Sequence, residues 1–219
     1  MANAVEKFNN VAIASTEAIN GITDANLQAL NGLEFTGVPD AHTLISTHTA
    51  SASSSLDITS GIDSTYDVYE FRFVNMHPAT NGVDFFFQVN AAGASGFNET
   101  MTTTVFRAAH DEADSATTLT YQISDDQAQG TGYQSIGNYG GNDNDQAVSG
   151  VLTLYAPSST TYVKHFTARA TDHMAHDQAG DFFVAGYINT TSAIDEISFK
   201  MEAGNIDAGT IKMYGIATS

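Results

Sequence analysis

Three short polar stretches contain residue types that could do chemistry. Ala109–Asp114 places His110 beside three carboxylates, and paired carboxylates can act as acid and base in glycoside hydrolysis. Gly141–Gln146 alternates Asn and Asp, whose oxygens are the ligands that calcium prefers. His173–Asp177 carries two imidazoles three positions apart, with His165 nearby in sequence, as a metal site could use.

None of the three stretches has the spacing that its chemistry needs. Neighbouring residues on a strand or loop point in different directions, so Ala109–Asp114 builds no carboxylate dyad by spacing alone. Gly141–Gln146 lacks the spacing and final Glu of an EF-hand and is rich in turn formers. His173–Asp177 is not a His-Glu-x-x-His motif and reads as a polar loop between strands. We therefore expect no catalytic residues, no metal and no cofactor, and a protein that is not an enzyme.

Two tyrosines lie in a segment rich in Gly and Asn. Gly130–Tyr133 lacks the Lys-Ser/Thr and the helix of a phosphate loop, so it predicts no nucleotide site. Tyr133 and Tyr139 could form an aromatic platform for a sugar, since exposed aromatic residues mark binding surfaces. The alternative use of both rings is packing in a core or turn.

Charge restricts the partners of the chain. The 219 residues include 25 acidic and seven basic side chains, for a net charge of −18, and no cysteine. Such a chain is repelled by nucleic acid and by anionic membrane surfaces. An outward-facing, self-repelling surface and a salt-adapted proteome explain the charge equally well. No apolar run approaches the ~20 residues of a membrane helix, and no secretory signal is evident at the start of the sequence.

Alternation of apolar and polar residues predicts strands after residue 65. Tyr69, Phe71 and Phe73 alternate with Glu70 and Arg72, as in a half-buried strand. In the next strand, Val83 to Asn90, the alternating apolar residues face one side and Phe86 faces the other. We therefore expect both faces of this strand to be covered. The other strands are expected at Thr100–Ala108, Leu119–Ser124, Val148–Ala156, Tyr162–Arg169 and Phe182–Asn189, with two antiparallel strands around the loop Ala203–Gly209 and a short edge strand at His42–Thr47. Short strands with regular turns favour an antiparallel β-sandwich of the jelly-roll type, and a closed barrel is the alternative.

The first 35 residues contain an eleven-residue repeat. Phe8–Val11, Ile19–Ile22 and Leu30–Leu33 each place Asn-Gly, or Asn-Asn, between two apolar residues, and such pairs mark turns. A short helix-compatible stretch such as Thr23–Ala29 follows the turn. A unit this small cannot bury its apolar residues alone, so we expect it to pack on its own domain, a sister subunit or a larger assembly. We therefore divide the chain into an arm, residues 1–36, partly helical, and a β domain, residues 37–219. The residues expected to make the assembly contact are Phe8, Val11, Ile19, Ile22, Leu27, Leu30 and Leu33.

Three parts of the chain resemble structural proteins of tailed phages, particularly marine ones. The first is Ala193–Met201 together with Gly204–Ile216, an ending typical of phage surface jelly rolls. The second runs from Asn90–Gly93 to Ser95–Thr100, and the third is the apolar-Asn-Gly repeat, which resembles leaders on head and tail components. The resemblance implies a virion protein and brings no catalytic motif, and fold alone does not give function.

Two functions follow as hypotheses. The first is a structural component on the virion exterior, as a capsid decoration, a head fibre or a tail component, anchored to other virion proteins by the arm. We expect a homo-oligomer, with a trimer as the favoured number, because closed symmetry gives multivalency. The alternative is a carbohydrate-binding, lectin-like module that recognises a host-surface glycan through Tyr133 and Tyr139. A glycan hydrolase is the third hypothesis, with no constellation to mark it.

Overall fold

The computed structural model describes residues 42–216 and six two-residue strands in the preceding segment. The chain divides into two compact units, Met1–Thr43 and Leu44–Ser219. The expected boundary between residues 36 and 37 lies outside the described residues and stays a prediction. No helix in the described part of the chain has the length and apolar character needed to cross a membrane.

The repeat in the arm forms three short hairpins. The strands are β1 (Lys7–Phe8), β2 (Val11–Ala12), β3 (Ala18–Ile19), β4 (Ile22–Thr23), β5 (Ala29–Leu30) and β6 (Leu33–Glu34). Each pair encloses two residues, with Phe8 opposite Val11, Ile19 opposite Ile22, and Leu30 opposite Leu33. This pairing agrees with the sequence pattern, because two-residue connections of Asn-Gly type match the twist of paired strands. The helix-compatible stretches between the hairpins lie outside the described residues.

Eight strands of the β domain form a jelly roll. In chain order they are β7 (His42–Ser53), β8 (Leu56–Ile58), β9 (Val68–Pro78), β10 (Val83–Ala91), β14 (Gln134–Gly140), β15 (Val148–Tyr155), β18 (Ile194–Met201) and β19 (Ile206–Ile216). One sheet has the order β7-β19-β9-β15 and the other β8-β18-β10-β14. The first strand thus pairs with the last, the second with the seventh, the third with the sixth and the fourth with the fifth. This is the pairing of a jelly roll, so the predicted all-β antiparallel sandwich is confirmed.

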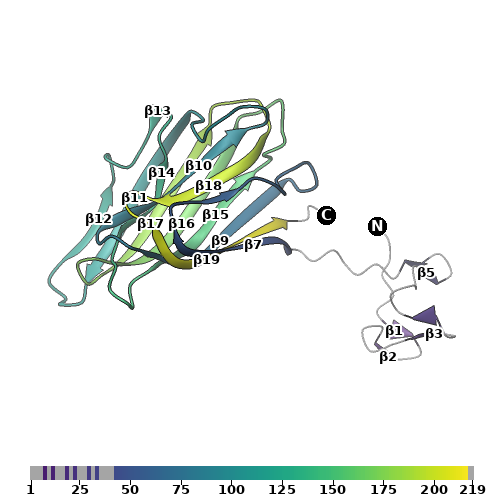
Figure 1. Cartoon of the computed structure of the whole chain (residues 1–219), viewed down its shortest axis with the longest axis horizontal. Helices are drawn as coiled ribbons and strands as arrows, with labels where there is room; N and C mark the ends of the chain where they lie inside the picture. The colour runs from purple at the N-terminus through teal and green to yellow at the C-terminus, as the bar shows by residue number, and fades with distance from the viewer. Residues whose placement is uncertain are drawn as a thin grey trace. The chain divides into compact units, whose positions relative to one another are not determined.

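Five further strands extend the first of these sheets. They are β11 (Met101–Asp111), β12 (Thr117–Tyr121), β13 (Ala128–Gly130), β16 (Lys164–Met174) and β17 (Gln178–Ile188). The larger sheet continues from β15 through β16 and β17 to β11, with β12 and β13 along the far side of β11. The label β12 stands at the left edge of the domain in Figure 1. One backbone pair, Gly140 with Met174, joins the larger sheet to the smaller one.

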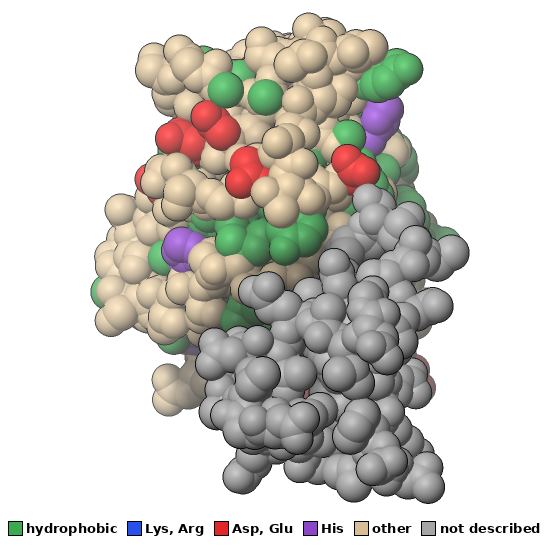
Figure 2. All heavy atoms as spheres, turned by 90° about the vertical axis from the view of Figure 1, so that its right-hand side faces the viewer, with side chains coloured by type: hydrophobic (Ala, Val, Ile, Leu, Met, Phe, Trp, Pro, Cys, Tyr) green, Lys and Arg blue, Asp and Glu red, His purple; other side chains and the backbone are tan. Residues whose placement is uncertain are grey.

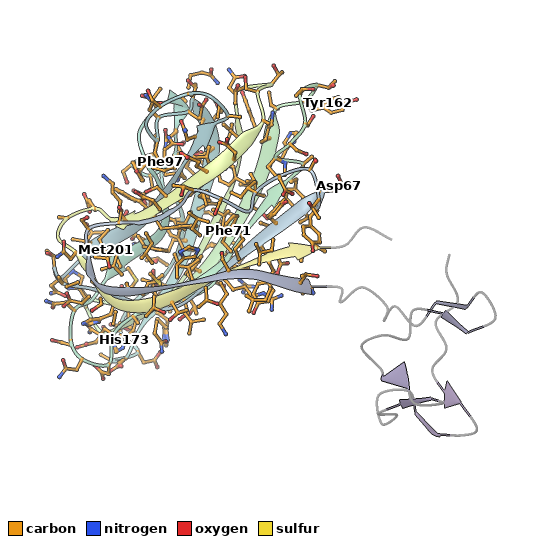
Figure 3. The ribbon with its side chains drawn as sticks, turned by 45° about the vertical axis from the view of Figure 1, so that its right-hand side comes forward. Asp67, Phe71, Phe97, Tyr162, His173 and Met201 are labelled. Carbon is orange, nitrogen blue, oxygen red and sulfur yellow. The ribbon has the colours of Figure 1, made fainter. Side chains whose placement is uncertain are left out.

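Aromatic side chains from both sheets fill the core. Phe71 and Phe73 of the larger sheet contact Phe199 and Phe85 of the smaller one, with ring centroids 5.8 and 5.3 Å apart. Figure 3 labels Phe71 between the two layers of strands. Burying a phenylalanine side chain contributes about 1.5–3 kcal/mol, so this cluster is a major source of stability. The period-2 pattern of β9 therefore marked the core correctly.

Strand β10 is covered on both faces, as the outward Phe86 predicted. Gln88 lies on the face away from the core, and it is fully buried. Its side-chain amide donates to the carbonyls of Glu99, Thr131 and Gly132 at 3.0, 3.2 and 2.8 Å. The loops after β10 and β13 thus lie over the smaller sheet, and the amide satisfies their buried carbonyls.

The two C-terminal strands are present as predicted, but they do not pair with each other in an antiparallel hairpin. Strand β18 pairs with β10 and β8, whereas β19 pairs with β9, so the two belong to different sheets. In a jelly roll consecutive strands step between the sheets, and alternation within a strand carries no information about its partner. The loop is also shorter than expected, because β19 begins at Ile206.

Candidate functional site

The outer face of the larger sheet carries an open groove. Strand β16 alternates strictly, with Phe166, Ala168 and Ala170 buried toward the core and His165, Thr167 and Arg169 exposed on the other side. The groove extends over β15, β16, β17, β11 and β12, and we call it the outer groove. Because its floor consists of small residues such as Gly150 and Ala179, the backbone can be approached closely there.

A row of planar side chains crosses this face. Backbone register places Arg169 opposite Phe183, Phe183 opposite Phe106, and Phe106 opposite Tyr121. The Phe106 and Phe183 rings stack with centroids 4.6 Å apart and planes 7° apart. The Arg169 guanidinium lies 4.7 Å from the Phe183 centroid, within the range of a cation–π interaction. These four residues form the planar ridge.

An ion pair fixes the end of the planar ridge. Asp181 accepts two hydrogen bonds from Arg169, from Nε at 3.0 Å and from Nη2 at 2.8 Å. The bidentate geometry holds the guanidinium flat against Phe183. The Asp181 carboxylate raises the pKa of Arg169 further above its ordinary value, so the pair stays ionised. Its two charges offset each other, which makes the ridge nearly neutral.

Hollows lie on both sides of the planar ridge. One has a volume of about 620 Å³ and is lined by Ala108, His110, Thr117, Ser149, Thr171 and Asp181, among others. The other has about 250 Å³ and is lined by Thr104, Thr153, Thr167 and Ala185 beside the ridge residues. This lining suits a hydroxylated, uncharged ligand. It combines hydroxyl groups, one imidazole and a neutralised ion pair with flat apolar groups.

Two of the motifs found in the sequence meet at one end of the outer groove. His110, Glu112 and His173 line a hollow of about 380 Å³. The backbone N–H of Glu112 donates to the carbonyl of Asp177 at 3.1 Å, and His173 Nε2 lies 3.9 Å from Glu112 Oε1. The loop expected at His173–Asp177 is shorter than predicted and spans Ala175–Asp177, because β16 extends through Met174. Among the side chains that the structure describes, no three His, Cys, Asp or Glu are arranged to hold a metal ion.

The two tyrosines proposed for glycan contact lie apart. Tyr133 donates to Ser198 Oγ at 3.1 Å, and its ring lies 4.3 Å from Lys200 Nζ. Tyr139 is 46% exposed, and its ring centroid lies 6.2 Å from that of His176. They stand six positions apart along the chain, which is roughly 20 Å of extended backbone. Each tyrosine can still contribute to a surface of its own, but they do not form one platform.

The Asn/Asp-rich stretch Gly141–Gln146 forms a turn held by its own groups. Gln146 Oε1 accepts from the N–H of Asp143 at 3.1 Å, and the N–H of Gln146 donates to the Asp143 carbonyl at 2.9 Å. The carbonyl of Gln146 lies 2.7 Å from His77 Nδ1. These bonds close the turn through its backbone groups and Gln146, and the solvated-turn interpretation stays a prediction.

Sequence reasoning missed a buried polar cluster between the two sheets. Asn138, which is 3% exposed, stands at its centre. Its side-chain amide donates to Asp84 Oδ1 at 3.1 Å and to Asp125 Oδ2 at 3.2 Å, and its backbone N–H donates to Asp172 Oδ2 at 3.0 Å. Arg107 Nη1 donates to Asn138 Oδ1. The cluster links β10 and β14 of the smaller sheet to β11 and β16 of the larger one.

Burial changes the acidity of this cluster. It raises the pKa of Asp84 to about 6 and that of Asp172 to about 6, and it also raises the pKa of Asp125. The cause is desolvation, which disfavours the charged carboxylate. Oδ1 of Asp172 and Nε of Arg107 are buried without a hydrogen-bond partner. The sequence carried one sign of the cluster, because Asp84 falls in a strand predicted to be covered on both faces.

The seven assembly residues fall on the arm hairpins or between them. Six occupy the positions on either side of the two-residue turns, as the strand bounds show, and Leu27 lies outside the described residues. Their role in assembly stays a prediction. No protein-family model matches this chain, and neither a curated protein nor a solved structure shows detectable similarity to it.

Proposed function

We propose that this chain is a structural component of a phage virion, displayed on the particle exterior as a capsid decoration, a head fibre or a tail component. The observation that carries the proposal is the arm, a tandem series of three hairpins. Among the residues that the structure describes, each hairpin has two backbone pairs. An isolated two-stranded hairpin is marginally stable at best, and these are shorter than most, so they need a surface to pack on.

The arm is suited to anchoring because its apolar residues recur at equal intervals. Phe8, Ile19 and Leu30 stand at the same place in successive hairpins, each opposite another apolar residue. Burying such pairs against other virion proteins, or against the arms of sister subunits, supplies the association energy. An arm shared among copies would give a homo-oligomer, with a trimer as the number that we favour.

Charge supports the outward position of the β domain. The chain carries a net charge of −18, which disfavours contact with packaged nucleic acid. In the view of Figure 2, acidic side chains are visible on the domain, and no Lys or Arg side chain is visible among the residues described. An acidic domain stays solvated and repels its neighbours, as suits a surface projection.

Immunogold labelling of intact particles tests this proposal. Antibodies raised against residues 44–216 should label the exterior of virions from the phage that encodes the chain. A chain carrying Phe8→Ser, Ile19→Ser and Leu30→Ser should keep the melting temperature of its β domain but fail to incorporate into particles. Virions that lack the protein, or that bind the antibody only after disruption, would contradict the proposal.

A carbohydrate-binding module is the second candidate function, and the outer groove favours it. The groove combines the planar ridge with hydroxyl groups from Thr117, Ser149 and Thr171. Sugars bind through such mixtures of flat apolar groups and hydrogen-bonding partners, because each pyranose ring has both kinds of surface. A surface protein of a virion could use this groove for a host glycan.

A glycan array with single-residue variants distinguishes the outer groove from the two tyrosines as the glycan-binding surface. Phe106→Ala and Arg169→Ala should abolish any glycan signal if the outer groove binds, whereas Tyr162→Ala serves as the exposed aromatic control. Figure 3 labels Tyr162 and His173 at opposite ends of the domain. Loss of the signal in Tyr133→Ala or Tyr139→Ala alone would assign binding to those tyrosines instead. An array without any signal would remove this candidate.

A further inference from the structure

Strand β12 is a free edge of the larger sheet. Among the described residues it pairs only with β11, through Phe106 to His110. All of its residues, Thr117 to Tyr121, are exposed. The N–H and C=O groups on the side away from β11 thus form an open template for another strand.

This edge lacks the features by which proteins block unwanted pairing. Residues 115–124 include no charged residue, no proline and no glycine, and they are rich in Thr, Tyr, Leu and Ile. The pairing of β12 with β11 has no register shift, so no bulge turns the edge away. Natural edge strands are usually protected by charge, proline or a bulge. An unprotected edge in a folded protein is therefore expected to have a partner.

Large apolar side chains gather at the same edge. Leu119 is 76% exposed, Tyr121 51% and Ile123 83%, and Phe106 on the neighbouring strand is 42% exposed. Leu119 and Tyr121 point to one face of the sheet, because side chains on a strand alternate. Exposed apolar residues scattered singly need no explanation, but a group beside an open edge marks an interaction surface.

We propose that β12 pairs antiparallel with β12 of a second copy of this chain, which joins the larger sheets of two subunits. Charge singles out this edge for contact between copies. Two copies that each carry −18 repel one another over most of their surfaces, whereas residues 115–124 carry no charged side chain of their own. An isologous contact also needs only one self-complementary surface. Here that surface is the β12 edge, with the twofold axis near Leu119.

The expected interface combines backbone bonds with side-chain contact. The two β12 strands exchange main-chain hydrogen bonds, and Leu119 and Tyr121 of both copies lie on the same face beside the twofold axis. Acidic residues bound the neutral stretch, with Asp114 before it and Asp125 and Asp126 after it. Their repulsion, together with the net charge, should be screened by salt, so association should strengthen as ionic strength rises.

Light scattering on the full chain tests the pairing. Leu119→Lys places a charge at the edge and should halve the mass of the assembly in solution without changing the melting temperature. Tyr162→Lys makes the same charge change at a residue that is 72% exposed and outside β12, and it should leave the mass unchanged. An unchanged mass for Leu119→Lys would overturn the proposal.

Cross-linking distinguishes self-pairing from pairing with another edge. The chain has no cysteine, so single cysteines can be introduced without competing thiols. Thr118→Cys, Leu119→Cys and Thr120→Cys sample the positions near the twofold axis. At least one should give a disulfide-linked dimer under mild oxidation, while Tyr162→Cys should not. If Leu119→Lys lowers the mass but none of the three cysteines cross-links, β12 binds a different surface and self-pairing is wrong.

Discussion

Asp172 and Gly180 are backbone partners on β16 and β17, and the Asp172 carboxylate fills the space that a side chain at position 180 would occupy. A Cβ built on Gly180 would overlap Asp172 Oδ1 and come within 3.1 Å of Met174 Sδ. The absence of a side chain at position 180 lets the carboxylate reach the backbone N–H of Asn138, which donates to it at 3.0 Å. The buried polar cluster therefore requires glycine at position 180.

Gly180→Ala should destabilise the β domain by about 1–3 kcal/mol, because the added methyl group must displace a buried carboxylate. Chemical denaturation measures this change. In an Asp172→Ala background the same substitution should cost less, since the group it displaces is gone. Gly132→Ala is the matched control, because a Cβ at that position meets nothing within 4 Å. Equal effects at positions 180 and 132 would contradict the account.

Stability should fall as pH rises from about 4 to about 7, the range that spans the unfolded and the folded pKa values of two buried carboxyl groups. Burial raises the pKa of Asp84 and of Asp172 from 3.8 to about 6, so the folded state binds more protons than the unfolded chain in this range. That contribution is fully present below the unfolded pKa and is lost as pH rises through about 6. The expected loss in the free energy of unfolding is about 1–3 kcal/mol for the coupled pair. Chemical denaturation at a series of pH values measures it.

The paired control separates the buried carboxyls from the net charge of the whole chain. Asp84→Asn and Asp172→Asn should each flatten the pH dependence, whereas Asp207→Asn on the exposed face of β19 should not. If all three variants show the wild-type slope, general charge repulsion explains the pH dependence and the buried cluster does not.

Removal of divalent cations should leave the melting temperature unchanged. The turn at Gly141–Gln146 is closed by its own hydrogen bonds, including Asp143 N–H to Gln146 Oε1 at 3.1 Å. Differential scanning calorimetry with and without EDTA checks this expectation. A clear drop in melting temperature with EDTA, reversed by added calcium, would show that the Asn and Asp side chains of this turn hold a cation.

Individual strands could be predicted from the sequence where apolar and polar residues alternate within the strand. Tyr69, Phe71 and Phe73 alternate with polar residues, and the structure buries all three. The Asn-Gly pairs after Ile19 and Leu30 likewise marked hairpin turns, because the turn type depends on two adjacent residues. The strand β14 was missed, since its Gly and Asn residues resemble a loop.

The outer groove could not be predicted, because its residues meet through strand pairing. Phe106 and Phe183 stand 77 positions apart in sequence, yet they are backbone partners. Phe182 and Phe183 gave a partial sign, since adjacent apolar residues on a strand place one on each face. The same reason explains the failed prediction for β18 and β19, whose alternation was correct and whose partners were not.

Light scattering of the full chain and of a chain that begins at Gly37 tests the central claim most directly. Both should carry Leu119→Lys, so that pairing through β12 does not contribute to the mass. We expect the full chain to be an oligomer, with a trimer as the favoured number, and the shortened chain to be a folded monomer with an unchanged melting temperature. Two folded monomers, or two oligomers of the same number, would contradict the claim that the arm assembles this protein.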